Sequence, residues 1–213
     1  MRTADDFNLF YATPDPWRIS LARFRDRVLR RSVAHFIDGK SVLELGCGEG
    51  HLTQAVFSNA TSITGVDLSD IAINRAKARK LSNARFEISD FNNISFENYD
   101  VIAAIECLYY LTPDDQNAFF SKIAREHRGK PLIISGPIIG ENEHRRYFTH
   151  TGLSELFAHH NISVVEHHNL NVYRRGALAN IAALLVRLPF GYRLLDWLPS
   201  ALIYQRCYII RSM

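Results

Sequence analysis

The chain has 213 residues, of which 47% are hydrophobic and 22% are charged, and its formal net charge is +3 at pH 7. This length suits one α/β domain with a buried core, and such weak basicity does not by itself indicate a nucleic-acid-binding protein. The cysteines Cys47, Cys107 and Cys207 have no paired spacing, and the acidic, proline-containing start does not resemble a secretory signal, so we expect a reducing, cytoplasmic setting.

The N-terminal region, residues 1–38, is predicted to be an irregular stretch followed by a helix. Residues 1–17 contain Pro14 and Pro16 in a turn-rich sequence, whereas apolar side chains recur at helical spacing over residues 18–37. The arginines of this helix form either a solvated face or part of the entrance for an acidic substrate. They are Arg18, Arg23, Arg25, Arg27, Arg30 and Arg31.

From residue 39 onward, short aliphatic runs alternate with helical patterns. A helix over residues 114–126 is marked by Thr112 as its N-cap and Pro113 at its first position. Strands that are apolar throughout and alternate with helices predict a parallel sheet with helices on both faces. The expected strands are residues 41–45, 62–66, 84–88, 101–105, 132–135, 162–166 and 204–211, and the other expected helices are residues 71–81 and 153–160.

The first predicted strand runs into the loop Gly46-Cys47-Gly48-Glu49-Gly50, and a helix is expected to begin near Leu52. Glycines at alternate positions let the backbone approach a ligand closely, and a helix start presents free N–H groups to it. A dinucleotide-binding loop has the spacing G-x-G-x-x-G, but His51 stands where its third glycine would be. The loop therefore favours a ligand without a pyrophosphate, the alternative being a glycine-rich turn that binds nothing.

Acidic residues follow the next two predicted strands. Asp67, followed by Leu68, ends the second strand, where a carboxylate can accept hydrogen bonds from both ribose hydroxyls. The alternative is that Asp67 caps the next helix, which Ser69 or Asp70 can do instead. The third strand ends at Asp90-Phe91.

Residues 41–135 resemble, in order, the motifs of class I S-adenosylmethionine-dependent methyltransferases, whose first motif, E-x-G-x-G-x-G, is matched at residues 44–50. The resemblance implies an α/β, Rossmann-like sheet of seven strands, six parallel and the last antiparallel, with helices on both faces. It implies one methyltransferase domain over residues 1–213, with a cofactor-binding core at 39–140 and a substrate-side region at 141–213. The implied cofactor is S-adenosyl-L-methionine, and the product S-adenosyl-L-homocysteine.

The same resemblance implies roles for individual residues. Asp90 would reach the adenine amino group and Phe91 would pack on the ring, the alternative being a loop acid beside a core phenylalanine. Glu106 would contact the methionine amino group or hold a substrate amine. The implied cofactor contacts are Glu44, Gly46, Cys47, Gly48, Gly50, Asp67, Leu68, Asp90, Phe91 and Glu106.

The segment after the fourth strand, Glu106-Cys107-Leu108-Tyr109-Tyr110, faces the methyl group in this superfamily. It lacks the [D/N]-P-P-[Y/F/W] motif of enzymes that methylate nucleic-acid bases, so no nucleic-acid partner is expected. Tyr109 and Tyr110 either line the pocket, with Tyr110 a catalytic candidate, or are partly buried loop aromatics. A histidine after the fifth strand, His144, is either a general base with a pKa of ~6.5 or a surface loop residue.

A narrower resemblance, to the nodulation-type (NodS-like) N-methyltransferases, rests on Pro14-Asp15-Pro16-Trp17-Arg18 and on residues 106–111. These enzymes act on an amino-sugar oligosaccharide, and their N-terminal segment lies over the cofactor. The resemblance therefore implies a lid that contains Tyr11, Trp17 and Arg18. No H-E-x-x-H motif or Cys/His quartet occurs, so we expect no metal.

We therefore expect methyl transfer to N or O of a small molecule or sugar conjugate, with an amino sugar or nucleotide sugar favoured. The alternatives are a protein or RNA substrate, or a non-catalytic cofactor-binding module. The apolar stretch 176–203 covers the active site, forms a homodimer contact or rests on a membrane interface. Its most apolar part, residues 176–188, is shorter than the ~20 residues of a membrane span, so we expect no transmembrane segment.

Overall fold

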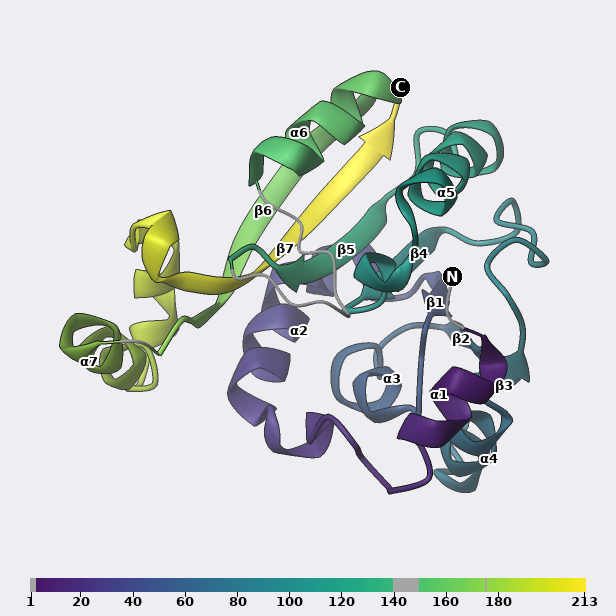
Figure 1. Ribbon diagram of the computed structural model, residues 1–213, viewed down its shortest axis with the longest axis horizontal. Coiled ribbons are helices and arrows are strands. Elements are labelled where there is room, and N and C mark those ends of the chain that lie inside the picture. The colour runs from purple at the N-terminus through teal and green to yellow at the C-terminus, as the bar shows by residue number, and fades with distance from the viewer. Residues whose placement is uncertain (1–2, 140–149, 175) are drawn as a thin grey trace.

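The computed structural model describes residues 3–139, 150–174 and 176–213, and within them seven strands form one sheet in the order β3-β2-β1-β4-β5-β7-β6 (Figure 1). β7 is antiparallel to both β5 and β6, and every other neighbouring pair is parallel. The prediction of six parallel strands and an antiparallel last strand is therefore confirmed. The strands are β1 (Ser41–Leu45), β2 (Ser62–Asp67), β3 (Ala84–Ile88), β4 (Val101–Ile105), β5 (Leu132–Pro137), β6 (Ile162–Val172) and β7 (Ile203–Ser212).

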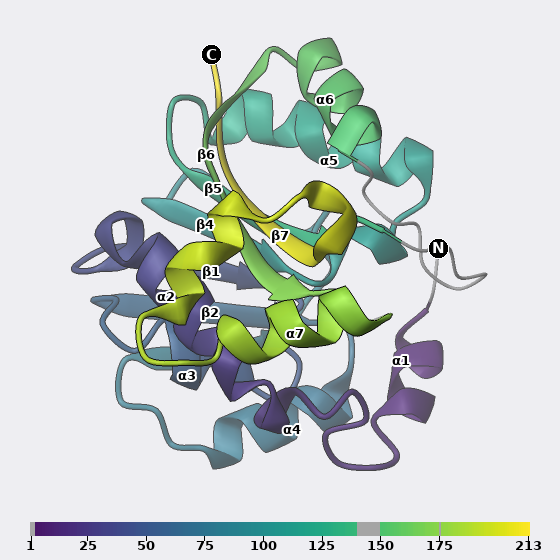
Figure 2. The same cartoon turned by 90° about the vertical axis from the view of Figure 1, so that its left-hand side faces the viewer.

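Helices cover both faces of this sheet, as predicted (Figures 1 and 2). Adjacent residues of β1 point to opposite faces, so Val42 packs under α2, α3 and α7 while Leu43 packs under α5 and α6. The α-helices are α1 (Ala4–Phe10), α2 (Arg23–Ile37), α3 (His51–Val56), α4 (Asp70–Ala78), α5 (Pro113–Glu126), α6 (His150–His159) and α7 (Ala177–Leu185). The 3₁₀ helices are η1 (Ile19–Leu21), η2 (Leu108–Tyr110), η3 (Gly191–Trp197) and η4 (Ser200–Leu202).

The structure corrects two predictions for the N-terminal region. Residues 4–10 are helical rather than irregular, because Thr3 and Asp6 form a capping box at the start of α1. α2 begins at Arg23 rather than at residue 18. Arg18 has a left-handed backbone (φ 53°), and the Asp15 carboxylate accepts the amide hydrogen of Ile19, which together produce a separate turn before α2.

Other local predictions agree with the structure more closely. Thr112 and Asp115 form a capping box, and Pro113 is the first residue of α5, as predicted. The expectation that the strands are apolar throughout is wrong for β3, which lies at the sheet edge and buries only Phe86. In the part of the chain that the structure describes, no helix combines the length and apolar character needed to cross a bilayer.

Candidate functional site

The loop after β1 has a backbone and a packing that require glycine. Gly46 and Gly48 have φ values of 66° and 52°, in the left-handed region that side chains disfavour. A Cβ atom on Gly46 would lie 2.7 Å from Cβ of Cys107, and one on Gly48 would lie 2.5 Å from the Tyr11 hydroxyl. The loop is therefore packed between the segment after β4 and the N-terminal segment, with backbone rather than side chain at its surface.

Asp67 joins this loop to the end of β2. Its Oδ2 accepts a 2.9 Å hydrogen bond from the Gly48 amide, and its Oδ1 accepts a 3.0 Å bond from the Ser69 amide. Burial raises the pKa of this carboxyl group, which is 8% exposed. Because a carboxylate has about four lone-pair positions, each oxygen can accept a further hydrogen bond from a ligand hydroxyl.

The side chain of Ser69, rather than that of Asp67, caps α4. Its hydroxyl accepts a 3.1 Å hydrogen bond from the Ala72 amide. The alternative interpretation of Asp67 as a helix cap is therefore wrong, and its carboxylate is left for the loop and for a ligand.

A cavity of about 310 Å³ lies where the carboxyl ends of β1, β2 and β4 meet the N-terminal segment. This is within the usual range for small-molecule sites, ~300–1,000 Å³. The predicted site residues that line it are Tyr11, Trp17, Gly46, Cys47, Gly48, Asp67, Leu68, Asp90, Phe91, Glu106, Tyr109 and Tyr110.

Three predicted cofactor contacts do not line this cavity. Arg18 is exposed, and Gly50 is the residue before α3, where Arg79, Phe86 and Ala76 surround it. Glu44 is 1% exposed and accepts a hydrogen bond from the Thr53 hydroxyl, so it supports the loop from below. His144 lies outside the described residues.

Burial raises the pKa of Glu44 to about 8, the hydrogen bond from Thr53 lowers it, and the charge of Asp67 raises it further. A carboxyl group with such a pKa is mostly protonated at neutral pH. Burial also raises the pKa values of the Cys47 and Cys107 thiols well above their ordinary value. Cys47 and Cys107 therefore line the cavity as neutral thiols, and the acids that line it are Glu49, Asp67, Asp90 and Glu106.

The segment after β4 adds an acid and two tyrosines to the wall of the cavity. Glu106 has a φ of 58°, an uncommon conformation for a residue with a side chain. Its Oε1 accepts a 2.8 Å hydrogen bond from the Ser135 hydroxyl, and its Oε2 lies 3.5 Å from the Tyr109 hydroxyl. The Tyr109 and Tyr110 rings lie 4.8 Å apart, so this wall has one carboxylate beside an aromatic pair.

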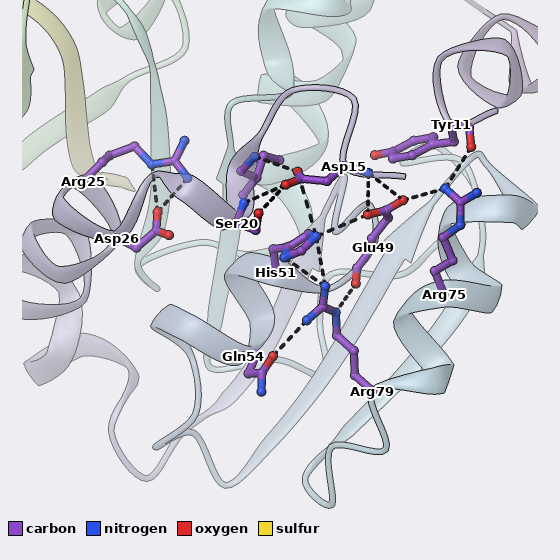
Figure 3. Close-up of polar contacts among 11 residues, drawn as sticks. Tyr11, Asp15, Ser20, Arg25, Asp26, Glu49, His51, Gln54, Arg75 and Arg79 are labelled. Carbon is purple, nitrogen blue, oxygen red and sulfur yellow. Dashed lines mark hydrogen bonds and ion pairs between the residues drawn. The ribbon is translucent and has the colours of Figure 1, made fainter. Parts of the chain in front are cut away.

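The N-terminal segment is fastened across the cavity through Glu49, as Figure 3 shows. The Asp15 amide donates a 3.0 Å hydrogen bond to the Glu49 carboxylate. Arg75 donates from one nitrogen to the carbonyl of Tyr11 (2.8 Å) and to Glu49 (2.7 Å). Trp17 packs edge-on to Tyr11 at 5.1 Å, and of the three residues predicted for a lid Tyr11 and Trp17 line the cavity.

Asp15, Glu49 and His51 offer potential metal-ligand atoms within 4.8 Å of one another. Arginines already supply positive charge to this group. Arg75 contacts Glu49, and an Arg79 nitrogen lies 2.9 Å from each ring nitrogen of His51 (Figure 3). We interpret the group as the fastening of the N-terminal segment.

The cavity also includes Arg25, which was predicted to lie either on a solvated face or at the entrance, and residues for which no role was predicted. Arg25 is 8% exposed and donates to Asp26 through Nε (2.9 Å) and an Nη nitrogen (2.6 Å). Its helical spacing from Val28 and Leu29 was a signal for its burial. Tyr204 and Gln205 come from the end of the chain, and no local pattern connects them to the loop. The others are Phe7, Ile19, Glu49, His51, Leu52, Ile105, Cys107 and Leu111.

The chain is similar in sequence to known methyltransferases. Residues 42–128 match the family model described as "Methyltransferase domain". The chain is 30% identical over 127 residues to "Ubiquinone biosynthesis O-methyltransferase" of Coxiella burnetii, which covers 57% of this chain and 53% of that protein. It is 34% identical over 107 residues to "Nodulation protein S" of Bradyrhizobium diazoefficiens, covering 47% and 51%. The chain spans about half the length of the curated relatives it matches.

Solved structures with low sequence identity share the fold. Magnesium protoporphyrin IX methyltransferase of Synechocystis, solved with bound S-adenosylmethionine, has a TM-score of 0.63 at 16% identity and covers 92% of this chain and 81% of its own. The 1,6-didemethyltoxoflavin-N1-methyltransferase of Burkholderia thailandensis has a TM-score of 0.66 at 18% identity, covering 99% and 87%.

Proposed function

We propose that this chain is a class I S-adenosylmethionine-dependent methyltransferase and that it methylates a nitrogen or oxygen atom of a small acceptor. The observation that carries the proposal is that one cavity contains both the glycine loop with Asp67 and the wall made by Glu106, Tyr109 and Tyr110. Transfer of a group between two bound molecules requires that their binding sites adjoin each other. Here the nucleoside-binding part of the cavity adjoins the acid and the aromatic rings.

The cofactor would lie along the carboxyl ends of the strands. In this proposal Asp67 accepts hydrogen bonds from the ribose hydroxyls, Asp90 accepts one from the adenine amino group and Phe91 packs on the ring. Gly46 and Gly48 place the loop backbone at the cavity wall, where a nucleoside can approach it. Arg25 holds the methionine carboxylate, because a buried guanidinium is a strong donor to such a group.

When bound, S-adenosylmethionine supplies a sulfonium methyl group that is already electrophilic, so the protein mainly contributes alignment and exclusion of water. Glu106 is the described acid on the acceptor wall. Its carboxylate holds an acceptor amine or hydroxyl by a hydrogen bond, and it can receive the proton that the acceptor loses. His144, outside the described residues, remains our second candidate for that proton.

For the acceptor we propose a ring-bearing small molecule or sugar conjugate, with an amino sugar or nucleotide sugar favoured. Tyr110, Trp17 and Tyr204 present flat aromatic surfaces on which a sugar or aromatic ring can stack. The likeness to Nodulation protein S supports an amine acceptor. The likeness to the ubiquinone biosynthesis enzyme supports a second candidate, O-methylation of a phenolic ring.

The proposal is tested in two steps, first for the cofactor and then for the acceptor. Calorimetry should show S-adenosylhomocysteine binding to the wild type, and its absence would contradict the proposal outright. A methyl-transfer screen with labelled S-adenosylmethionine then compares amino sugars, nucleotide sugars and phenols.

The role of Glu106 can be separated from folding and from cofactor binding. On the acceptor found by the screen, Glu106→Gln should lower kcat by ~10²-fold or more while leaving the affinity for S-adenosylhomocysteine within a few-fold. If His144→Ala shows that loss and Glu106→Gln keeps the full rate, the proton passes to the histidine instead.

A further inference from the structure

Large apolar side chains are exposed along residues 178–197, on α7, on η3 and on the residues that connect them. We call this set the apolar face. Leu178 is 78% exposed and Trp197 is 87% exposed, although a soluble surface rarely gathers such residues in one segment. The members are Leu178, Ile181, Leu184, Leu185, Leu188, Phe190, Leu194 and Trp197.

The opposite side of the same segment packs into the protein. Ala179, Ala183 and Val186 of the α7 region are each 1% exposed and lie in the core cluster that includes α2 and β6. Leu195 of η3 is buried in the same cluster. A helix that is apolar on both sides is typical of one that is covered on both sides. The core covers the inner side, and among the residues that the structure describes none buries the outer side.

Arginines border the apolar face, and two of them connect its segment with α2. The Arg187 guanidinium lies 5.2 Å from the Phe24 ring of α2, and that of Arg31 lies 4.5 Å from the Tyr192 ring of η3. The pKa of Arg187 is lowered, first by burial and then by the positive charge of the neighbouring Arg174. Arg23, Arg27 and Arg30 are exposed on α2 as well.

Acidic side chains do not balance these arginines. Within residues 176–199 the only acid is Asp196, and its Oδ1 accepts a 3.2 Å hydrogen bond from the Asn169 amide. None of the ion pairs between described residues involves Arg31, Arg187 or Arg193. The surface that would complement this face therefore has an apolar interior and a negatively charged boundary.

We propose that the apolar face docks on a membrane surface that contains anionic lipids. Its leucines, Phe190 and Trp197 would enter the boundary between headgroups and acyl chains, while Arg187, Arg193 and the α2 arginines contact lipid phosphates. The guanidinium groups of Arg31 and Arg187 stack on aromatic rings, and long arginine side chains can reach the headgroup level from such positions. A membrane fits better than a second copy of this chain, because two copies would bring the same unbalanced arginines together.

Vesicle flotation tests the proposal with the whole chain. The wild type should float with vesicles of equal parts phosphatidylcholine and phosphatidylglycerol, and should float at least tenfold less with vesicles of phosphatidylcholine alone. Leu178→Ser combined with Trp197→Ser should weaken flotation about tenfold or more, since each loses an inserted apolar side chain. Leu9→Ser is the matched control, because Leu9 of α1 is 76% exposed, nearly as much as Leu178.

The charge contribution has its own pair of variants. Arg187→Gln with Arg193→Gln should weaken flotation several-fold and reduce its sensitivity to salt. Arg85→Gln with Arg125→Gln removes two exposed arginines from β3 and α5 and should have no effect. If both pairs weaken flotation equally, general basicity rather than this face attracts the protein, and the proposal is wrong.

Fluorescence locates the contact. Phosphatidylcholine with brominated acyl chains, mixed with phosphatidylglycerol, should quench the wild type but not Trp197→Phe, which retains Trp17 as its one tryptophan. Absence of quenching would overturn the docking geometry. Light scattering tests the remaining alternative, a dimer. If the wild type does not float and is a dimer, and if Leu178→Ser dissociates that dimer, the apolar face contacts a second copy and the proposal is wrong.

Discussion

The amide of Gly48 donates a 2.9 Å hydrogen bond to Oδ2 of Asp67, and this contact ties the loop after β1 to the end of β2. The bond uses one lone pair of an acid that a bound ribose would also use. The same carboxylate therefore holds the loop in place, and under the proposed function it would also accept hydrogen bonds from the ligand.

Asp67→Asn should weaken S-adenosylhomocysteine binding by about 10- to 100-fold, because hydrogen bonds to a charged group are worth about 1.5–3 kcal/mol. Calorimetry measures the loss directly. Glu87→Gln, an exposed acid on β3 with side-chain exposure of 50%, is the control and should bind as the wild type does. Unchanged affinity in Asp67→Asn would exclude the ribose contact.

Gly48→Ala should destabilise the protein and weaken ligand binding, because the new Cβ would lie 2.5 Å from the Tyr11 hydroxyl. Gly39→Ala isolates the backbone part of this effect. Gly39 has a similarly positive φ of 72°, but nothing lies within 4 Å of its Cβ position. We expect the control to lose about 1–2 kcal/mol of unfolding free energy, and Gly48→Ala to lose more. Equal losses in chemical denaturation would mean that the Tyr11 contact is unimportant.

Glu49→Gln should loosen the N-terminal segment, because the carboxylate that receives the Asp15 amide and Arg75 loses its charge. Hydrogen exchange over residues 4–17 should become several-fold faster, while exchange in β4 and β5 stays unchanged. S-adenosylhomocysteine should dissociate faster from this variant in stopped-flow measurements. Glu97→Gln, an exposed acid before β4, is the control. Exchange that stays slow in Glu49→Gln would show that the aromatic contacts alone hold the segment.

Glu44→Gln should change stability in a pH-dependent way. The pKa of Glu44 is raised by burial from 4.5 to about 8, so its contribution to stability is complete below 4.5 and is lost as the pH rises toward 8. Glutamine cannot ionise and can still accept the Thr53 hydrogen bond. The unfolding free energy of the variant should therefore rise relative to the wild type between pH 4.5 and about 8, on the order of a few kcal/mol.

Asp100→Asn is a control of opposite sign for that experiment. The amide and hydroxyl of Ser41 donate to the Asp100 carboxylate at 2.9 Å and 2.7 Å, and these bonds lower its pKa from 3.8. The contribution of Asp100 is present above pH 3.8 and is lost as the pH falls through its lowered pKa. Its variant should be less stable than the wild type near neutral pH, with a difference that shrinks in acid. A pH-independent difference for Glu44→Gln would contradict the raised pKa.

Local sequence was a good guide where a structure depends on neighbouring residues. The capping box at Thr112 and Asp115, the glycine loop and the position of Asp67 at a strand end all depend on spacing along a short stretch. Thr3 and Asp6 have the spacing of a capping box, which indicates the start of α1. The prolines after α1 nevertheless led to the prediction of an irregular segment.

The sequence by itself thus determined the order of strands and helices, the glycine loop and the resemblance to methyltransferases. Only the tertiary structure decided that Glu44 supports the loop instead of facing the cavity, that Arg25 lines it while Arg18 does not, and that Tyr204 reaches it from the other end of the chain. The physical reason is that helix caps, strands and turns depend on interactions between nearby residues. The walls of a cavity are set by packing between segments that the sequence keeps far apart.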